Sequence, residues 1–193
     1  MTRNASLGPS HFQRLYEADV DPWQFRTSGY EQAKYRRTIG ALGTRRFRSA
    51  FEVGCSIGVL THMLGERCDS VLAVDFVDQP LETARAGCAD QPWVRFEKMQ
   101  IPGDWPAGTF DLIVLSEVLY FLVPTDVAAA ADRAVASLDD DGVVVLVNWL
   151  GRSGDPCTGD EAAELFIARA GARLRQAGGE RTDGYRLDVL ARA

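Results

Sequence analysis

Residue types on which many functional classes depend are scarce in this chain of 193 residues. It has two histidines and four cysteines, and the cysteines form no CxxC pair and have no histidine at metal-ligand spacing. We therefore expect no metal site and no catalytic cysteine. Unpaired thiols are typical of a reducing compartment, so the sequence predicts a cytoplasmic protein.

Long apolar runs and a basic excess are also missing. No stretch approaches the roughly 20 apolar residues of a membrane-spanning helix, and the first nine residues lack the apolar core of a signal peptide. The net charge is −6, from 21 basic and 27 acidic side chains, whereas nucleic-acid surfaces usually carry a basic excess. We expect neither a membrane nor a nucleic-acid partner. The composition, 46% hydrophobic and 25% charged, is that of a globular domain.

The most informative feature that is present is a glycine turn between an apolar strand and a helix. The strand, 49–53, contains Glu52 and leads into Gly54 and Gly58, and a helix is predicted over 57–67. A second apolar strand, 70–74, is followed by Asp75, which lies 21 positions after Gly54. This spacing is typical of a nucleotide-binding βαβ unit, in which an acid after the second strand binds a ribose.

The glycine pattern distinguishes between nucleotides. A dinucleotide site needs G-x-G-x-x-G, whose middle glycine and helix N-terminus receive a pyrophosphate. The corresponding run here is Gly54-Cys55-Ser56-Ile57-Gly58, which lacks that fingerprint, and an acid lies at the strand end. A ligand with a ribose and positive charge but no phosphate fits better, so we predict S-adenosylmethionine (SAM). A nicotinamide oxidoreductase and a tight turn with no ligand are the alternatives.

The remaining pattern predicts an α/β fold with a parallel sheet that ends in an antiparallel hairpin. A polar lead-in with helices at 11–16 and 30–42 is interrupted at Asp21-Pro22-Trp23, because the residue before a proline avoids helical backbone. Asp183-Gly184 is a hairpin signal between strands 172–180 and 185–191. The other predicted elements are strands at 94–99, 110–116 and 143–148, helices at 80–88, 125–138 and 160–176, and a turn at Asp140-Asp141-Gly142.

Several residues near the predicted strand ends have two interpretations. Asp75 is expected to bind both ribose hydroxyls, although a lone aspartate there is also a common helix cap. Gln100, or a backbone carbonyl beside it, would contact the adenine edge. Glu117 follows strand 110–116, where ligands bind in open α/β sheets, and is either an acceptor contact or a helix cap. Trp23 is either a core residue or a cation–π partner of the sulfonium.

Catalytic candidates are few. Methyl transfer needs alignment of the nucleophile and exclusion of water more than acid–base chemistry, and we expect Glu117 to orient an amine acceptor. A hydroxyl acceptor would need a base, for which His11 and Glu117 are candidates, with Tyr16 or Tyr120 as orienting groups. The scarcity of histidine favours nitrogen over oxygen. The Tyr-x-x-x-Lys spacing at 30–34 precedes the nucleotide fold, so we do not interpret it as a dehydrogenase pair.

The chain resembles class I SAM-dependent methyltransferases and, among them, the nodulation protein S (NodS) family. The resemblance rests on Asp21-Pro22-Trp23 with Tyr30-Glu31, on Glu52-Val53-Gly54-Cys55 with Gly58, and on Asp75. It is most specific at Phe110-Asp111-Leu112-Ile113-Val114 and Glu117-Val118-Leu119-Tyr120-Phe121-Leu122. It resumes weakly at Gly159-Asp160-Glu161, and the region 148–159, expected to line the acceptor groove, diverges.

The resemblance implies a Rossmann-like seven-stranded fold, with residues 1–48 as an N-terminal helical cap and 49–193 as the methyltransferase domain. It implies SAM as donor, S-adenosylhomocysteine (SAH) as product, and a small-molecule acceptor such as the free amine of an oligosaccharide. O-methylation of a sugar or secondary metabolite, or a non-catalytic SAM-binding protein, are the alternatives. The residues expected at the donor are Trp23, Glu52, Gly54, Cys55, Ser56, Gly58, Asp75, Phe76, Met99, Gln100, Ser116, Glu117 and Val118; the catalytic candidates are Glu117, His11 and Tyr120.

Overall fold

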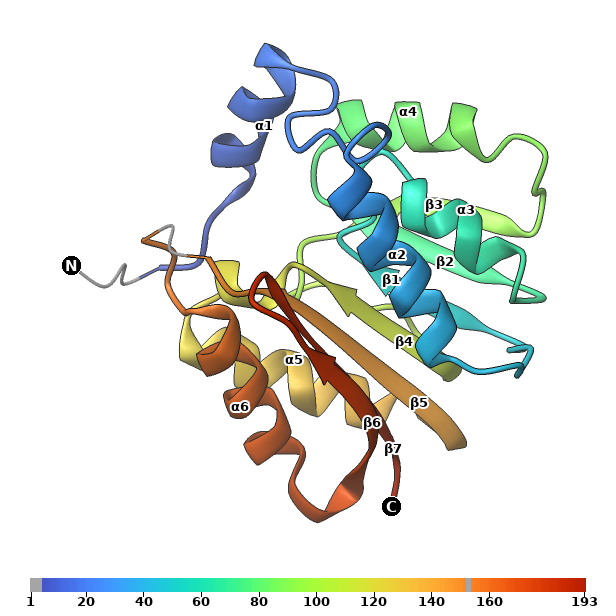
Figure 1. The fold of residues 1–193 in the computed structure, drawn as a ribbon, viewed down its shortest axis with the longest axis vertical. Helices are drawn as coiled ribbons and strands as arrows, with labels where there is room; N and C mark the ends of the chain where they lie inside the picture. The colour runs from blue at the N-terminus through green and yellow to red at the C-terminus, as the bar shows by residue number, and fades with distance from the viewer. Residues whose placement is uncertain (1–4, 152–153) are drawn as a thin grey trace. The chain divides into compact units, whose positions relative to one another are not determined.

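The computed structural model describes residues 5–151 and 154–193 (Figure 1). The chain forms two compact units. The N-terminal unit comprises Gly8–Met99, and the C-terminal unit comprises Gln100–Ala193 together with the segment that ends at Leu7. These limits differ from the 48/49 boundary expected from the sequence, which stays a prediction about a cap and a catalytic domain.

Two helices open the N-terminal unit: α1, Pro9–Ala18, and α2, Gly29–Ala41. Proline suits the first turn of α1 because its missing N–H has no partner within a helix there. The Ser28 side chain caps α2 by accepting a hydrogen bond from the Glu31 N–H at 3.4 Å. The predicted interruption at Asp21-Pro22-Trp23 is confirmed, because α1 ends before it and α2 begins after it.

A βαβαβ segment completes the N-terminal unit. Its elements are β1 (Ala50–Val53), α3 (Val59–Gly65), β2 (Val71–Asp75), α4 (Asp78–Gly87) and β3 (Val94–Lys98). The strands pair in parallel in the order β3-β2-β1. Strand β1 is buried throughout and β2 up to its last residue, which explains their apolar sequences. Helices α3 and α4 pack on each other and both contact β2.

The C-terminal unit has two parallel strands followed by an antiparallel pair. Strand β4 pairs in parallel with β5, β5 in antiparallel with β7, and β7 in antiparallel with β6. Helices α5 and α6 pack side by side, and both contact β5 (Figure 1). The elements are β4 (Phe110–Ser116), the 3-10 helix η1 (Leu119–Phe121), α5 (Pro124–Ala136), β5 (Leu138–Trp149), α6 (Gly159–Ala170), the 3-10 helix η2 (Gly171–Arg173), β6 (Leu174–Arg181) and β7 (Tyr185–Arg192).

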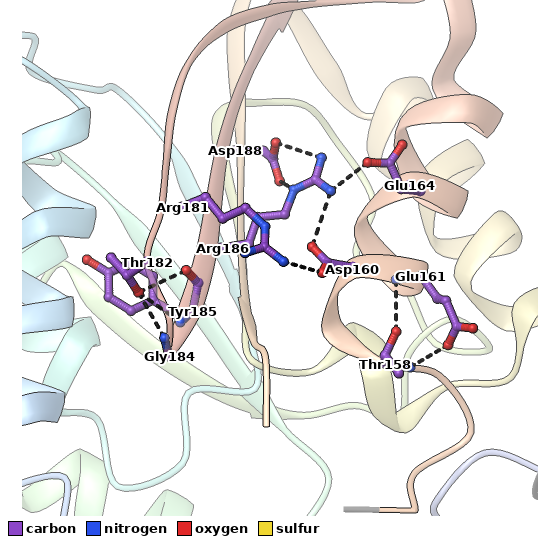
Figure 2. Close-up of polar contacts among 10 residues, drawn as sticks. All are labelled: Thr158, Asp160, Glu161, Glu164, Arg181, Thr182, Gly184, Tyr185, Arg186 and Asp188. Carbon is purple, nitrogen blue, oxygen red and sulfur yellow. Dashed lines mark hydrogen bonds and ion pairs between the residues drawn. The ribbon is translucent and has the colours of Figure 1, made fainter. Parts of the chain in front are cut away.

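The complete sheet has seven strands in the order β3-β2-β1-β4-β5-β7-β6. The pairings β1–β2, β2–β3 and β4–β5 are parallel, whereas β7 pairs in antiparallel with both β5 and β6. The predicted fold class, a Rossmann-like and mostly parallel sheet with a C-terminal antiparallel hairpin, is confirmed. The hairpin turn is held by the Thr182 hydroxyl, which accepts hydrogen bonds from the N–H groups of Gly184 and Tyr185 at 3.2 and 3.0 Å (Figure 2).

Two predicted element boundaries are wrong. Asp140-Asp141-Gly142, predicted as a turn, lies within β5, where the pairing with β4 shifts register between Phe110 and Leu112. The helix predicted to continue to residue 176 ends at Ala170, because Gly171 leaves helical backbone with φ 56° and ψ −143°. A glycine tolerates that conformation, and the chain then turns into β6.

A network of charged side chains ties α6 to the hairpin (Figure 2). Arg186 on β7 lies 2.6 Å from Glu164 and 3.6 Å from Asp160 on α6, and 2.8 Å from Asp188 on its own strand. Arg181 on β6 contacts Asp160 at 2.6 Å. The α6 N-terminus is closed by a capping box between Thr158 and Glu161. These charges serve the packing of the C-terminal unit.

The described residues contain neither a membrane-spanning helix nor a cluster of metal ligands. None of the helices there is long and apolar enough to cross a membrane. Within 5–151 and 154–193, no group of three or more histidine, cysteine or acidic residues could hold a metal ion. The four cysteines are buried, and none of them forms a disulfide.

Candidate functional site

The turn after β1 holds its shape through the backbone. The N–H groups of Gly54 and Cys55 both donate to the Val74 carbonyl, at 2.8 and 3.0 Å, so the turn is fastened to the end of β2. Gly54 has a φ of 76° and Gly58 a φ of 80°, in the left-handed region that favours glycine. The backbone of Ser56 is also in the left-handed region, with a φ of 48°. Both glycines of the predicted turn therefore adopt a backbone conformation that other residues rarely adopt.

Gly58 has a second structural reason to be glycine. A Cβ at this position would lie 2.9 Å from the Cβ of Ala84 on α4. Its backbone also opens α3, where its carbonyl accepts a hydrogen bond from the His62 N–H at 3.0 Å. Close packing of α3 on α4 is thus one reason for a glycine here, and the predicted place of Gly58 at the donor stays a prediction.

Asp75 lies at the end of β2 with both carboxylate oxygens engaged. Its Oδ2 accepts a hydrogen bond from the Ser56 N–H at 3.0 Å, and its Oδ1 accepts one from the Val77 N–H at 3.1 Å. Burial raises the pKa of Asp75 to about 6, although backbone N–H groups oppose the rise. The carboxylate is thus oriented by the glycine turn as well as by the start of α4. Each oxygen retains acceptor capacity for a ligand hydroxyl.

Glu52 is the most unusual acid of the N-terminal unit. It is 1% exposed, and its Oε2 has no hydrogen-bond partner. Burial raises the pKa of Glu52 to about 7, with a smaller opposing contribution from Thr61 and a further rise from Asp75. A buried carboxylate oxygen without a partner is costly. Oε2 keeps its capacity to accept a further hydrogen bond.

Aromatic rings from the lead-in pack around α1. Trp23, partly buried, lies edge-on to Tyr16 at a centroid distance of 5.6 Å and stacks on Phe25 at 5.5 Å. Phe76, directly after β2, lies edge-on to Phe12 at 5.2 Å. Trp23 and Phe76, both predicted donor contacts, therefore belong to one aromatic cluster of the N-terminal unit.

The loop that carries Trp23 is held by an aspartate. Asp21 accepts hydrogen bonds from the N–H groups of Phe25 and Arg26 at 2.8 and 3.0 Å. Gln32 on α2 donates to the Phe25 carbonyl at 2.7 Å. The Asp-Pro-Trp segment is thus a built loop with a fixed ring position.

Two further candidates occupy opposite ends of the N-terminal unit's sequence. His11 is a half-buried residue of α1, edge-on to Phe12 at 5.0 Å. Met99 follows β3, and its N–H donates to the Asp75 carbonyl at 3.0 Å, which joins the ends of β2 and β3. The predicted strand-end residue Met99 is therefore brought to Asp75.

The remaining candidates belong to the C-terminal unit. Gln100 is exposed, and its N–H donates to Asp104 at 2.8 Å. Glu117 has a φ of 60°, and its N–H donates to the Val147 carbonyl at 2.7 Å, beside Ser116 and Val118. Tyr120 is 7% exposed in η1, and its carbonyl accepts from the Cys157 N–H at 3.2 Å. Glu117 is half-buried in a strained backbone conformation.

Asn148 was not a candidate in the sequence analysis. It lies near the end of β5, is fully buried, and neither polar atom of its amide has a hydrogen-bond partner. A polar residue that ends an apolar strand was the available signal. The other missed contact is the bond between the Tyr16 hydroxyl and Ser56 Oγ, at 2.6 Å, which joins residues 40 positions apart.

Comparison with known proteins extends this description. Residues 10–175 match the family model of nodulation protein S (NodS). The chain belongs to the NodS family. Nodulation protein S of Bradyrhizobium diazoefficiens is 34% identical over 121 residues, which is 61% of this chain and 57% of that relative. Nodulation protein S of Azorhizobium caulinodans is 27% identical over 180 residues, 88% of this chain and 84% of the relative.

Solved structures have similar folds. A protein of Pseudomonas syringae, provisionally assigned as a methyltransferase, is 33% identical with a TM-score of 0.75 and aligns over 86% of this NodS-family chain and all of its own. The N-methyltransferase NodS of Bradyrhizobium japonicum, in complex with SAH, has a TM-score of 0.83 at 19% identity, over 93% of this chain and 97% of its own. The aligned region spans little more than half of the Bradyrhizobium diazoefficiens relative.

Proposed function

We propose that this chain is a SAM-dependent N-methyltransferase that acts on an amine of a small, sugar-like acceptor. Two things support the proposal. The family match covers residues 10–175, and the relative in complex with SAH is an N-methyltransferase. The observation that carries the donor assignment is the buried, unpartnered Oε2 of Glu52, two residues before Gly54.

The residues of the N-terminal unit fit such a donor. Glu52 would meet its ammonium group, because a buried carboxylate with one oxygen unpartnered gains from a cation. Asp75 would take the ribose hydroxyls with its remaining lone pairs. Trp23 supplies an aromatic face, and a face of this kind attracts a sulfonium by roughly 0.5–2 kcal/mol.

The chemistry requires little from the protein beyond alignment. SAM, when bound, supplies an electrophilic methyl carbon whose bond to sulfur breaks as the new bond to the acceptor forms. The acceptor nitrogen must be neutral when it attacks, and it loses a proton afterwards. We assign Glu117 to orient the amine and accept that proton, with Tyr120 as an orienting hydroxyl and His11 as an alternative base.

We also propose a cytoplasmic location, supported by the four buried thiols, none of which is paired in a disulfide. Fractionation of cells that produce the tagged full chain tests this directly. Recovery of the protein outside the cytoplasm would contradict the proposal.

The function is tested by measuring SAH release from SAM with two matched acceptors. One acceptor is a chitooligosaccharide with a free terminal amine, and the other is its fully N-acetylated twin. Turnover with the amine alone is expected. An Asp75→Ala variant, tested in parallel, should lose turnover.

Other outcomes contradict defined parts of the proposal. Turnover with both acceptors would replace nitrogen by a hydroxyl as the methyl acceptor. Turnover with neither, despite tight SAM binding, would overturn the sugar-amine assignment. Absence of SAM binding by the wild type would overturn the methyltransferase assignment itself.

A further inference from the structure

One buried hydroxyl links helix α1 to the glycine turn. Tyr16 is 3% exposed, and its phenolic oxygen lies 2.6 Å from Ser56 Oγ. The Tyr16 backbone carbonyl also accepts a hydrogen bond from Gln79 of α4 at 2.9 Å. A phenylalanine would fill the same space among the neighbouring rings, so packing alone does not account for the hydroxyl.

Ser56 holds a backbone conformation that a non-glycine residue rarely adopts. Its φ of 48° lies in the left-handed region. That conformation aims the Ser56 N–H at Asp75 Oδ2, at 3.0 Å. The hydrogen bond between the Tyr16 hydroxyl and Ser56 Oγ holds the side chain of Ser56, while its backbone N–H donates to Asp75. Burial raises the pKa of Tyr16 well above its usual value, so the hydroxyl stays neutral and the hydrogen bond persists over the physiological pH range.

This arrangement orients the carboxylate of Asp75. With Oδ2 held by Ser56 and Oδ1 held by Val77, the carboxylate plane is set before any ligand arrives. A group that is already oriented loses less entropy when a ligand binds. If Ser56 is released, one of the two contacts that orient the carboxylate is weakened.

We propose that Tyr16 is a positioning residue that acts through Ser56 to orient Asp75 for the ribose of the donor. The inference rests on the proposed function, because it takes SAM and SAH as the ligands. It assigns α1 a part in ligand discrimination, through a chain of two hydrogen bonds that runs from Tyr16 to Ser56 and from Ser56 to Asp75.

The test compares two ligands by titration calorimetry, SAH and its 2′-deoxy analogue, on the wild-type full chain and on Tyr16→Phe. The two hydrogen bonds from Tyr16 to Ser56 and from Ser56 to Asp75 are called the relay below. Loss of the first of them should weaken SAH binding about two- to tenfold. Binding of the 2′-deoxy analogue, which lacks a hydroxyl for Asp75, should weaken less. The ratio of the two affinities therefore shrinks in the variant.

Two further variants keep the result interpretable. Ser56→Ala breaks the same contact from the other side and should shrink the ratio equally, with no further change in the double variant. Tyr185→Phe removes another buried tyrosine hydroxyl, bonded to Glu180 at 3.4 Å in the C-terminal unit. It should leave both affinities unchanged.

The outcomes separate the relay from the donor assignment. If Tyr16→Phe weakens both ligands by the same factor, or neither, the relay is overturned while the proposed function stands. If the wild type binds neither ligand, the proposed function falls and the relay falls with it.

Discussion

Acidic side chains are used in opposite ways in the two units. In the N-terminal unit, Glu52 is buried and Asp75 half-buried, no cationic side chain pairs with either, and desolvation raises the pKa of each. In the C-terminal unit, Asp132 lies between Arg169 and Arg173, whose guanidinium groups hold its pKa below the usual value. The contrast agrees with the proposal that the first pair meets a ligand, whereas the ion pairs of the second acid join α5 to α6 and η2.

The largest expected effect follows from removing one acid of each kind. Asp75→Ala should weaken SAM binding about a hundredfold or more, because two charge-assisted hydrogen bonds to the ribose are lost. Asp132→Ala, the matched control, should bind SAM as tightly as the wild type. Calorimetric titration measures both. A variant without Asp75 that binds SAM normally would end the ribose assignment.

The next effect concerns pH and Glu52. A carboxyl whose pKa is higher in the folded protein than in the unfolded chain binds protons more tightly when folded, so unfolding free energy falls as pH rises between the two values. For Glu52 this window runs from 4.5 to about 7. The loss should be on the order of 3 kcal/mol across it, and Glu52→Gln should remove that part of the pH dependence. Urea unfolding from pH 4.5 to 8 measures it.

Donor affinity should change in the opposite direction. Ionised Glu52 attracts an ammonium group and the neutral acid does not, so SAM binding should strengthen as pH rises through about 7. Titrations of wild type and Glu52→Gln over the same pH range test this. Parallel pH profiles for the two proteins would contradict the assignment of Glu52 to the donor.

A smaller effect distinguishes two arginines of the network in Figure 2. Burial opposes the charge of Arg186, but the carboxylates of Asp188 and Glu164 keep its pKa above the usual value. Arg186→Leu should destabilise the fold by about 2 kcal/mol, because Asp188, 5% exposed, loses its cation. Arg181→Leu removes an exposed pair with Asp160 and should change stability by less than about 1 kcal/mol. Equal losses in urea unfolding would mean that burial does not distinguish the two.

The smallest expected effect is a gain in stability. Asn148→Leu replaces a buried amide that has no partner by an apolar side chain of similar size. The substitution should stabilise the chain by about 1 kcal/mol, because a desolvated polar group is removed. Thermal unfolding measures the change, and Asn148→Asp, which buries a carboxyl instead, should shift the midpoint the other way.

Local sequence patterns predicted the elements that depend on only a few neighbouring residues. The apolar runs of β1, β2 and β4, the break at Asp21-Pro22-Trp23 and the turn at Asp183-Gly184 are each determined by a few neighbouring residues. The end of α6 was misplaced because Ala172 to Gln176 suits either a helix or a strand, and the glycine at 171 decides it. The start of β5 was misplaced because three polar residues in a strand look like a turn.

The site was predictable only in part, for a related reason. Gly54 and Asp75 follow from spacing, since a βαβ unit brings strand ends together. The unpartnered oxygen of Glu52 and the bond from Tyr16 to Ser56 depend on which side chains meet across the fold. Such long-range contacts leave no pattern in one sequence. The roles of His11, Glu117 and Tyr120 stay predictions.

The buried cysteines make the chain its own reporter of local opening. Cys55, Cys68 and Cys88 belong to the N-terminal unit and Cys157 to the C-terminal unit, and each is at most 6% exposed. A thiol reagent can reach them only when the surrounding structure opens. The labelling rate of each cysteine, followed by peptide mass spectrometry, therefore reads the opening of each unit separately. A bound donor should slow labelling of Cys55 far more than that of Cys157.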